Sequence, residues 1–333
     1  MNQRLSLIFM SISRSIRRLK WIGSVVVAVS CLSALAEEPE TEPNAVYVAK
    51  MQAVVDFLET ELKTATDLLE RQSSSKAEVD LARVDLAKAR HNLAFAENNQ
   101  AEVVRQCLLL VEIRSRQLQR HEKMAALGFG SKLKQIKAMR QLAGSRYLLG
   151  RVQGNPADVL DQLERVVQLH NEELSYLTRQ QKEGAVSTME LNRARHRTTV
   201  AEHHLAHSKE DSPSVLPQLR QSAVLCQQEF DQIKRLRHLG YADVLDEYNA
   251  HRHLLHAKLL VADIENEPTA MQQQFDELIR LHEQTLPKLG SYRKGKLARL
   301  FIEQELARDH ARKAQFLQDG YLADELCIAA MDF

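Results

Sequence analysis

A fixed spacing recurs along this chain and constrains its fold more than any other feature. Three glycines, Gly128, Gly184 and Gly240, follow one another with a period of 56, without insertion or deletion, and residues 72–75 form a degenerate earlier copy. Each glycine is followed three residues later by a side chain of the kind that caps a helix. These caps are Ser131, Ser187 and Asp243. Self-similarity at a fixed period of this length is typical of repeat architectures.

A second helix-breaking signal lies about half a period after each glycine. The sequence there reads Asn155-Pro156, Ser212-Pro213 and Glu267-Pro268, with Asn98-Asn99-Gln100 in the first copy. Glycine ends helices and proline begins them, so two breakers per period predict two helices per repeat. The pairs Ser75 with Glu78 and Ser187 with Glu190 predict capping boxes, Asp243 with Asp246 predicts an acidic variant, and Ser131 lacks the reciprocal partner.

Apolar residues between these breakers follow the alternating spacing of three and four that is typical of a heptad seam. Because 56 is eight heptads, each repeat keeps its seam in phase. One seam position holds Leu58, Arg114, His170, Cys226 and His282 in successive copies, which predicts a position that tolerates polar residues. The helix after each glycine carries a stripe of smaller residues, and small residues allow helices to approach closely.

The sequence therefore predicts an all-α protein of about ten helices, arranged as tandem antiparallel hairpins in a coiled-coil-like array or solenoid. The repeat domain covers residues 37–290, and residues 291–333 form an atypical helical cap in which the register is lost. No alternating segment of the kind that a membrane β-barrel needs is present, so none is expected.

Composition supports the helical prediction and argues against a nucleic-acid partner. Glycine and proline number only 11 and 7, and aromatic residues make up 5% of the chain. Lys and Arg number 45 against 44 for Asp and Glu, so the chain lacks the basic excess that nucleic-acid binders carry.

The first 36 residues are interpreted as a secretory signal peptide. A basic stretch precedes an apolar run that ends in Ala34-Leu35-Ala36, a small-residue cleavage pattern. Two alternatives stay open: an uncleaved anchor, and lipidation of Cys31 in the manner of a bacterial lipoprotein. Membrane contact is expected only through one of these two. The predicted location is the periplasm or cell envelope of a bacterium.

Thirteen histidines raise the alternative of a histidine-based metal-binding periplasmic protein. The best cluster is His203, His204 and His207, of which the first and last share a helical face, followed by His251, His253 and His256. No motif supplies the further ligands that a metal site requires, so the sequence predicts neither a metal site nor a cofactor. Cys107, Cys226 and Cys327 remain after the leader and form no disulfide framework.

No catalytic motif is found, and the chain is predicted not to be an enzyme. Phosphate loops, dinucleotide fingerprints, the serine elbow of hydrolases and metalloprotease helices are all missing from the sequence. Basic runs at residues 234–238 and 293–296 are interpreted as solvated helix ends.

Two of the turn sequences resemble those of envelope efflux systems. The sequence Gly184-Ala185-Val186-Ser187, with Glu190-Leu191 and Ala194-Arg195 after it, is similar to the hairpin tip of periplasmic efflux adaptors. Gly240-Tyr241-Ala242-Asp243-Val244-Leu245, with Leu254-Leu255 and Ala257 after it, is similar to the tips of TolC-like outer-membrane efflux proteins. The resemblance implies periplasmic α-helical hairpins whose tips meet partner tips.

The function that these observations favour is a non-enzymatic, exported scaffold that binds other envelope proteins. The predicted contact residues are the tip residues Gly128, Ser131, Gly184, Ser187, Gly240 and Asp243. The main alternative is a TolC-like or adaptor-like efflux component that forms a homo-oligomer.

Overall fold

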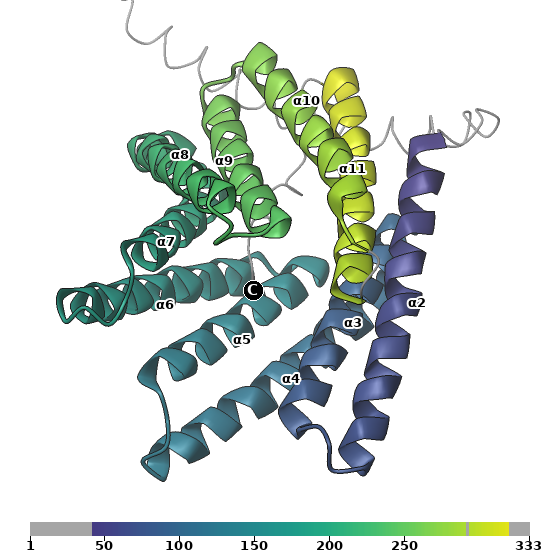
Figure 1. Ribbon diagram of the computed structural model, residues 1–333, viewed down its shortest axis with the longest axis vertical. Coiled ribbons are helices and arrows are strands. Elements are labelled where there is room, and N and C mark those ends of the chain that lie inside the picture. Colours follow the sequence, from purple (N-terminus) through teal and green to yellow (C-terminus); the bar gives the residue numbers. More distant parts are fainter. Residues whose placement is uncertain (1–41, 291–292, 320–333) are drawn as a thin grey trace, which may run out of the picture. The chain divides into compact units, whose positions relative to one another are not determined.

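The computed structural model describes residues 42–290 and 293–319, and Figure 1 shows their helices in chain order. The predicted signal peptide, with Cys31, lies outside the described residues. The chain divides into two compact units, residues 1–45 and 46–333, and apart from the start of α2 the described helices belong to the second.

Ten α-helices and no strand occupy the described ranges, which confirms the predicted all-α fold. They are α2 (Glu42–Glu70), α3 (Lys76–Ala96), α4 (Gln100–Ala126), α5 (Lys132–Val152), α6 (Pro156–Lys182), α7 (Thr188–Ser208), α8 (Leu216–His238), α9 (Val244–Ile264), α10 (Pro268–Thr285) and α11 (Arg293–Asp319). Two short 3₁₀ helices accompany them, η1 (Ser212–Val215) before α8 and η2 (Leu286–Lys288) after α10. None of the described helices is both long and apolar enough to span a membrane.

The helix boundaries follow the period of the sequence. The four helices α3, α5, α7 and α9 each contain 21 residues, and each begins one full period after its predecessor. The ends of α2, α4, α6 and α8 are likewise separated by one period each. The repeat in the sequence is therefore a repeat of antiparallel helical hairpins.

A residue in the left-handed backbone region ends each helix from α2 to α9. Gly128, Gly184 and Gly240 have φ values of +79°, +73° and +80°, and Gln72 has +59° at the equivalent position. The turns at the other end of the hairpins also contain a left-handed residue, at Asn98, Gly154, Glu210 and Asn266. At α8, the N–H groups of Gly240 and Tyr241 donate back to the carbonyls of Arg237 and Leu236 at 2.9 and 2.8 Å, which is the Schellman arrangement.

The predicted helix caps are present, with one exception in detail. Ser75 and Asp243 form complete capping boxes with Glu78 and Asp246. At Ser187 the prediction of a complete box is wrong, because only the backbone N–H of Glu190 bonds the serine hydroxyl. Glu190 is an exposed residue, so solvent can satisfy its carboxylate.

Successive helices pack side by side and bury the predicted seam. The position that holds Leu58, Arg114, His170, Cys226 and His282 is buried in all five copies. The Arg114 guanidinium donates to the Gln141 side-chain oxygen at 2.9 Å, which links α4 to α5. The polar residues at this position are therefore buried, as predicted, and the repeat tolerates them.

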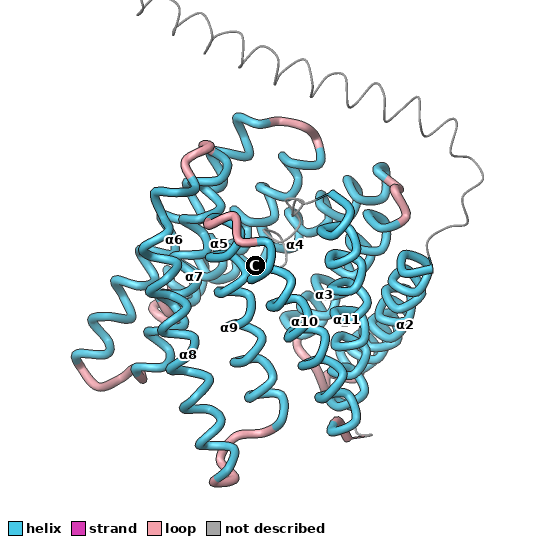
Figure 2. The backbone as a smooth tube through the Cα atoms, turned by 90° about the horizontal axis from the view of Figure 1, so that it is seen from above, coloured by secondary structure: helices cyan, strands magenta, loops and turns pink. Residues whose placement is uncertain are grey.

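The last helix, α11, breaks the period and contacts both ends of the array, and Figure 2 shows it between α10 and α2. Leu297 and Leu300 pack on the α2–α3 cluster around Met51, and Lys50 of α2 pairs with Glu303 at 2.6 Å. On the other side, Phe316 packs against Phe275 of α10. The helix predicted beyond Gly290 is thus a joint between the first and last hairpins.

The left-handed turn residues give a first prediction. Nothing lies within 4 Å of a Cβ placed on Gly128, so Gly128→Ala changes only the backbone preference and should lower the free energy of unfolding by about 1 kcal/mol. Gln72→Gly at the equivalent turn should raise it by a similar amount. Urea unfolding of the two variants measures both changes in the free energy of unfolding. Equal changes of the same sign would contradict the assignment of residues 72 and 128 to equivalent left-handed turn positions.

Candidate functional site

The six predicted contact residues lie on three separate hairpin tips, one glycine and one cap on each. All six are exposed: Gly128 and Ser131 between α4 and α5, Gly184 and Ser187 between α6 and α7, and Gly240 and Asp243 between α8 and α9. The structure brings together the two residues of each tip, but it does not gather the three tips into one site. They are equivalent positions of the repeat.

The three caps bond the backbone of their own helices. The Ser131 and Ser187 hydroxyls accept from the N–H groups of Lys134 and Glu190 at 3.5 and 3.1 Å, and the Asp243 carboxylate accepts from the Asp246 N–H at 2.9 Å. These residues therefore shape the tips, and a contact surface there would be formed by their neighbours.

Those neighbours are large apolar side chains on either side of two of the glycines. Leu127 and Phe129 are 68% and 77% exposed, and Leu239 and Tyr241 are 66% and 80% exposed. The two pairs occupy equivalent positions of the repeat, two periods apart. The sequence-based prediction missed them, although a leucine and an aromatic residue flanking a turn glycine were visible in both copies.

The middle tip has the same backbone without these side chains. Glu183 and Ala185 flank Gly184, yet Gly184 has the same left-handed conformation as Gly128 and Gly240. The N–H groups of Gly184 and Ala185 also make the same two bonds to the end of their helix, at 2.9 Å each. The turn therefore forms without an exposed leucine or aromatic residue.

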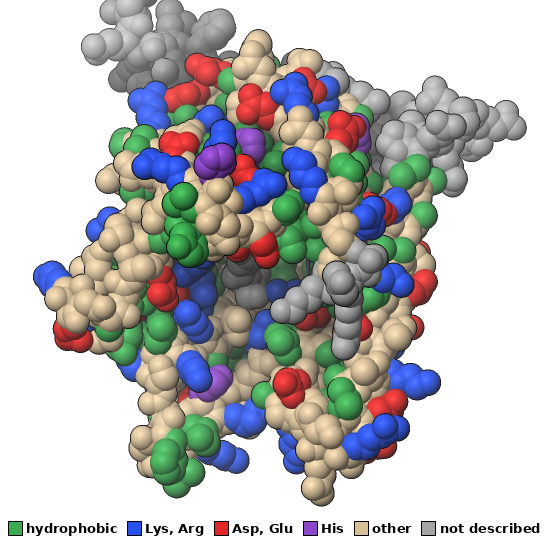
Figure 3. Space-filling view, in the orientation of Figure 1, with side chains coloured by type: hydrophobic (Ala, Val, Ile, Leu, Met, Phe, Trp, Pro, Cys, Tyr) green, Lys and Arg blue, Asp and Glu red, His purple; other side chains and the backbone are tan. Residues whose placement is uncertain are grey.

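A cleft of about 940 Å³ lies beside the α8–α9 tip. Basic side chains of the last turns of α8 line it together with Leu239, and Asp231 and Glu247 contribute two carboxylates. The basic residues are Lys234, Arg235, Arg237 and His238. On the face shown in Figure 3, positive and negative side chains are interspersed.

The histidine cluster singled out in the sequence lies largely in the core. His203 and His204 are buried, and the His203 ring centroid lies 5.4 Å from that of His204 and 6.2 Å from that of His207. Burial lowers the pKa of His203 to about 4, so the ring is neutral at pH 7. In the described part of the chain, no group of three or more His, Cys, Asp or Glu side chains is arranged to hold a metal ion.

The second histidine group does not converge either. His251 stacks on Phe230 with centroids 4.3 Å apart, whereas His253 lies near His196 on a different side of the helix. The thiols of Cys107 and Cys226 are free and buried, and burial raises the pKa of each to about 12. Neither is a reactive thiolate at neutral pH.

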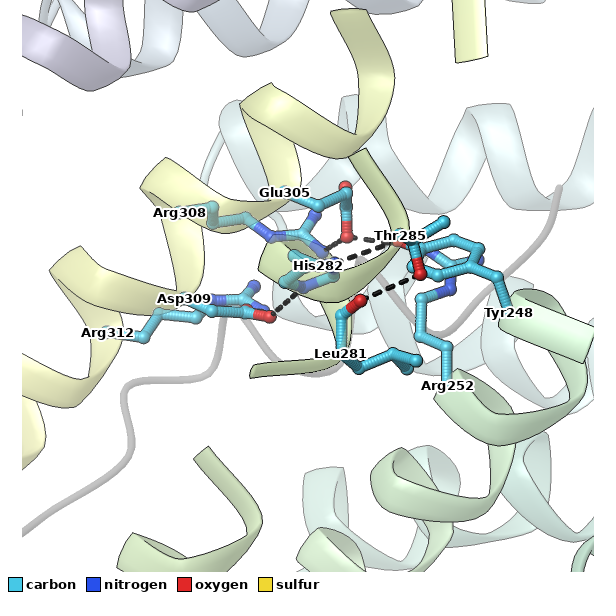
Figure 4. Close-up of polar contacts among 9 residues, drawn as sticks. All are labelled: Tyr248, Arg252, Leu281, His282, Thr285, Glu305, Arg308, Asp309 and Arg312. Atoms are coloured by element: carbon cyan, nitrogen blue, oxygen red, sulfur yellow. Dashed lines mark hydrogen bonds and ion pairs between the residues drawn. The ribbon is translucent and has the colours of Figure 1, made fainter. Parts of the chain in front are cut away.

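A buried polar network joins α9, α10 and α11, and Figure 4 shows its residues converging on His282. The Tyr248 hydroxyl donates to Nδ1 of His282 at 3.0 Å, and Nε2–H of His282 donates to the Asp309 carboxylate at 2.9 Å. His282 and Asp309 are 0% and 1% exposed. These two bonds fix the tautomer of the histidine.

Charged groups on α11 complete this network. Arg308 pairs with Glu305, which also accepts from Arg252 of α9 at 3.3 Å, and Arg312 lies 3.8 Å from Asp309. Burial raises the pKa of Asp309, but the His282 hydrogen bond and the charges of Arg308 and Arg312 outweigh it and hold the pKa well below its usual range. This tyrosine–histidine–aspartate chain is deeply buried and links side chains of three helices, so it holds α9, α10 and α11 together.

Searches against models of known protein families, curated proteins and solved structures found no match to this chain. The resemblance to efflux adaptors and TolC-like proteins is therefore untested and stays a prediction.

The Asp309 network gives a second prediction. Asp309→Asn removes the carboxylate that lies 3.8 Å from Arg312 and weakens the His282 bond, so it should lower the free energy of unfolding by about 3 kcal/mol, as expected for breaking a buried ion pair. As a control, Asp276→Asn removes the more exposed pair with Lys313 between α10 and α11 and should cost less than about 1 kcal/mol. Similar losses for the two variants, measured in urea, would contradict a special role for the buried network.

The buried histidines give a third prediction, on pH. Burial, with Arg140 and Arg197 nearby, lowers the pKa of His170 to about 2, and that of His203 is about 4. A depressed histidine pKa means that the unfolded chain binds the proton first, so stability is fully present above about pH 6.5 and is lost as pH falls below it. Each such histidine should cost about 2 kcal/mol by pH 5.

Thermal unfolding at pH 7 and pH 5 measures this loss. His203→Gln should reduce the difference in Tm between the two pH values, whereas His310→Gln, at an exposed position of α11, should leave it unchanged. A chain equally stable at pH 7 and pH 5 would contradict neutral burial of these rings.

Proposed function

We propose that this protein is a non-enzymatic, exported cell-envelope scaffold that binds partner proteins through its hairpin tips. The observation that carries the proposal is the matching pair of exposed flanks, Leu127 with Phe129 and Leu239 with Tyr241, on two tips of the repeat. Export rests on the basic and apolar pattern of residues 1–36, which lie outside the described residues.

The exposed flanks are not needed for folding, and this supports a role in binding. The α6–α7 tip builds the same turn with Glu183 and Ala185. An exposed leucine and aromatic ring on a fixed turn gain free energy when a partner covers them, at about 25 cal/mol for each Å² of apolar surface removed from water. Aromatic residues are also enriched among the side chains that dominate protein interfaces.

The tips also suit binding because their backbone is rigid. At both, the left-handed glycine, the Schellman bonds and the cap of the following helix fix the loop before a partner arrives. A preformed contact surface loses little conformational entropy on association.

The experiment places a photo-reactive phenylalanine analogue, p-benzoyl-phenylalanine, at position 129 or 241 of the full chain in cells of the source organism. Irradiation is expected to yield adducts of discrete mass from both positions. The control is the same analogue at Gln153, an exposed residue in the turn at the opposite end of the hairpins, from which adducts should be missing.

Three outcomes would count against the proposal. Adducts from position 153 as abundant as those from 129 and 241 would indicate non-specific contact. A complete lack of adducts from both tips would overturn the binding role. Adducts consisting only of a second copy of this chain, with a defined oligomer in native mass measurement, would favour the efflux-component alternative. N-terminal sequencing of the recovered protein tests export, since cleavage after Ala36 leaves Glu37 as the first residue.

A further inference from the structure

The cleft beside the α8–α9 tip differs in charge from the tips that repeat it. In the last five residues of α8, four side chains are basic: Lys234, Arg235, Arg237 and His238. The equivalent residues of α6 are Thr178, Arg179, Gln181 and Lys182, and those of α4 are Glu122, Lys123, Ala125 and Ala126. One basic residue in the last turn is enough to favour a helix end, so ending the helix does not explain this cluster.

Lys234 and Arg235 carry charges that no acidic partner among the described residues offsets. Arg237 pairs with Glu247 at the start of α9, so those two charges cancel. Within the described residues, no carboxylate lies within ion-pair distance of Lys234 or Arg235. The Lys234 ammonium lies 5.9 Å from the centre of the Phe230 ring, and the Asp231 carboxylate accepts from the Gln227 amide at 3.1 Å.

The unpaired charges adjoin the exposed apolar flanks of the same tip. Leu239 lines the cleft, and Tyr241 lies two residues further along and is 80% exposed. The site thus combines an open cleft, in which basic side chains outnumber acidic ones, with a leucine and an aromatic ring at its edge. Arginine and tyrosine side chains are among those most enriched at the centres of protein interfaces.

We infer that this cleft binds an acidic segment of a partner protein. Carboxylates of the segment pair with Lys234 and Arg235, and an apolar side chain between them packs against Leu239 and Tyr241. A volume of about 940 Å³ suits a few residues of extended or helical chain. A peptide can offer carboxylates to Lys234 and Arg235 and an apolar side chain to Leu239 and Tyr241 together, so the chemistry of the site favours a peptide over lipid headgroups.

This inference rests on the proposed function and identifies the chemistry of one partner. It also predicts different partners for the two apolar tips. The α4–α5 tip has the apolar flanks Leu127 and Phe129, but three of the four positions that are basic in α8 are there occupied by Glu122, Ala125 and Ala126. Acidic segments are therefore expected to bind at the α8–α9 tip and not at the α4–α5 tip.

The test measures fluorescence anisotropy of two labelled peptide pools on the full chain. Both pools contain 12-residue peptides in which a charged residue alternates with a randomised one; the charged residue is Glu or Asp in the first pool and Lys or Arg in the second. The acidic pool is expected to bind saturably and more weakly at higher salt, and the basic pool is expected not to bind.

Matched variants locate the binding. The double variant Lys234→Glu and Arg235→Glu should weaken binding of the acidic pool by about tenfold or more, because two attractions become repulsions. The control is Thr178→Glu with Arg179→Glu, the same positions on α6, and it should change binding less than about twofold. Tyr241→Ala should weaken binding several-fold, whereas Phe129→Ala should leave it unchanged.

Several results would overturn the inference. They are equal binding of both pools, no binding of the acidic pool, and unchanged binding by the Lys234→Glu and Arg235→Glu variant with its helical circular dichroism intact. Binding of phosphatidylglycerol vesicles that depends on these residues, in place of the acidic pool, would assign the cleft to lipid. If photo-adducts form at positions 129 and 241 and one of these negative results is also found, the acidic-segment inference fails and the proposed function stands. If the photo-adducts are missing, both the inference and the proposed function fail.

Discussion

The structure depends on one backbone constraint, a left-handed residue that ends each helix at a fixed place in the period. Gln72, Gly128, Gly184 and Gly240 set one end of the hairpins, and a second series headed by Asn98 sets the other. Because each such turn closes the same pair of backbone bonds, the helices from α2 to α9 end at matching places in the period. Matching boundaries keep the heptad seams in phase, and in-phase seams let each hairpin pack against the next.

A repeat of this kind leaves an unpartnered face at each end, and α11 covers both. It contacts α2 through an apolar cluster and the Lys50–Glu303 pair, and α9 and α10 through the His282 network. The network sits at the seam position that other copies fill with Leu58 or Cys226. Arg114 at this position links α4 to α5, whereas His282 bonds Tyr248 of α9 and Asp309 of α11, so the position becomes the attachment point of the last helix.

The repeat, the helix count and the seam were predictable because they depend on local signals: glycine and proline breakers, capping residues and heptad spacing. The partners of α11 were not, because Asp309 and Glu303 pair with residues 27 and 253 positions away, and nothing in a single sequence links them. Exposure of the tip flanks was also missed. Leu239 and Tyr241 look like core residues by type, and only the fold shows that the turn holds them outward.

At the tips, the residues that set the backbone conformation are different from the residues that set the surface chemistry. The backbone is specified by the left-handed residue and the cap, which recur at the tips of all three glycine copies whatever flanks them. The flanking positions are therefore free to differ: Leu and Phe on the first apolar tip, Glu and Ala on the next, Leu and Tyr beside a basic cleft on the third. Substitutions there alter surface chemistry at little cost in stability, because they touch neither the turn nor the seam. An array built in this way presents several different surfaces on one repeated frame, as the proposed scaffold role requires.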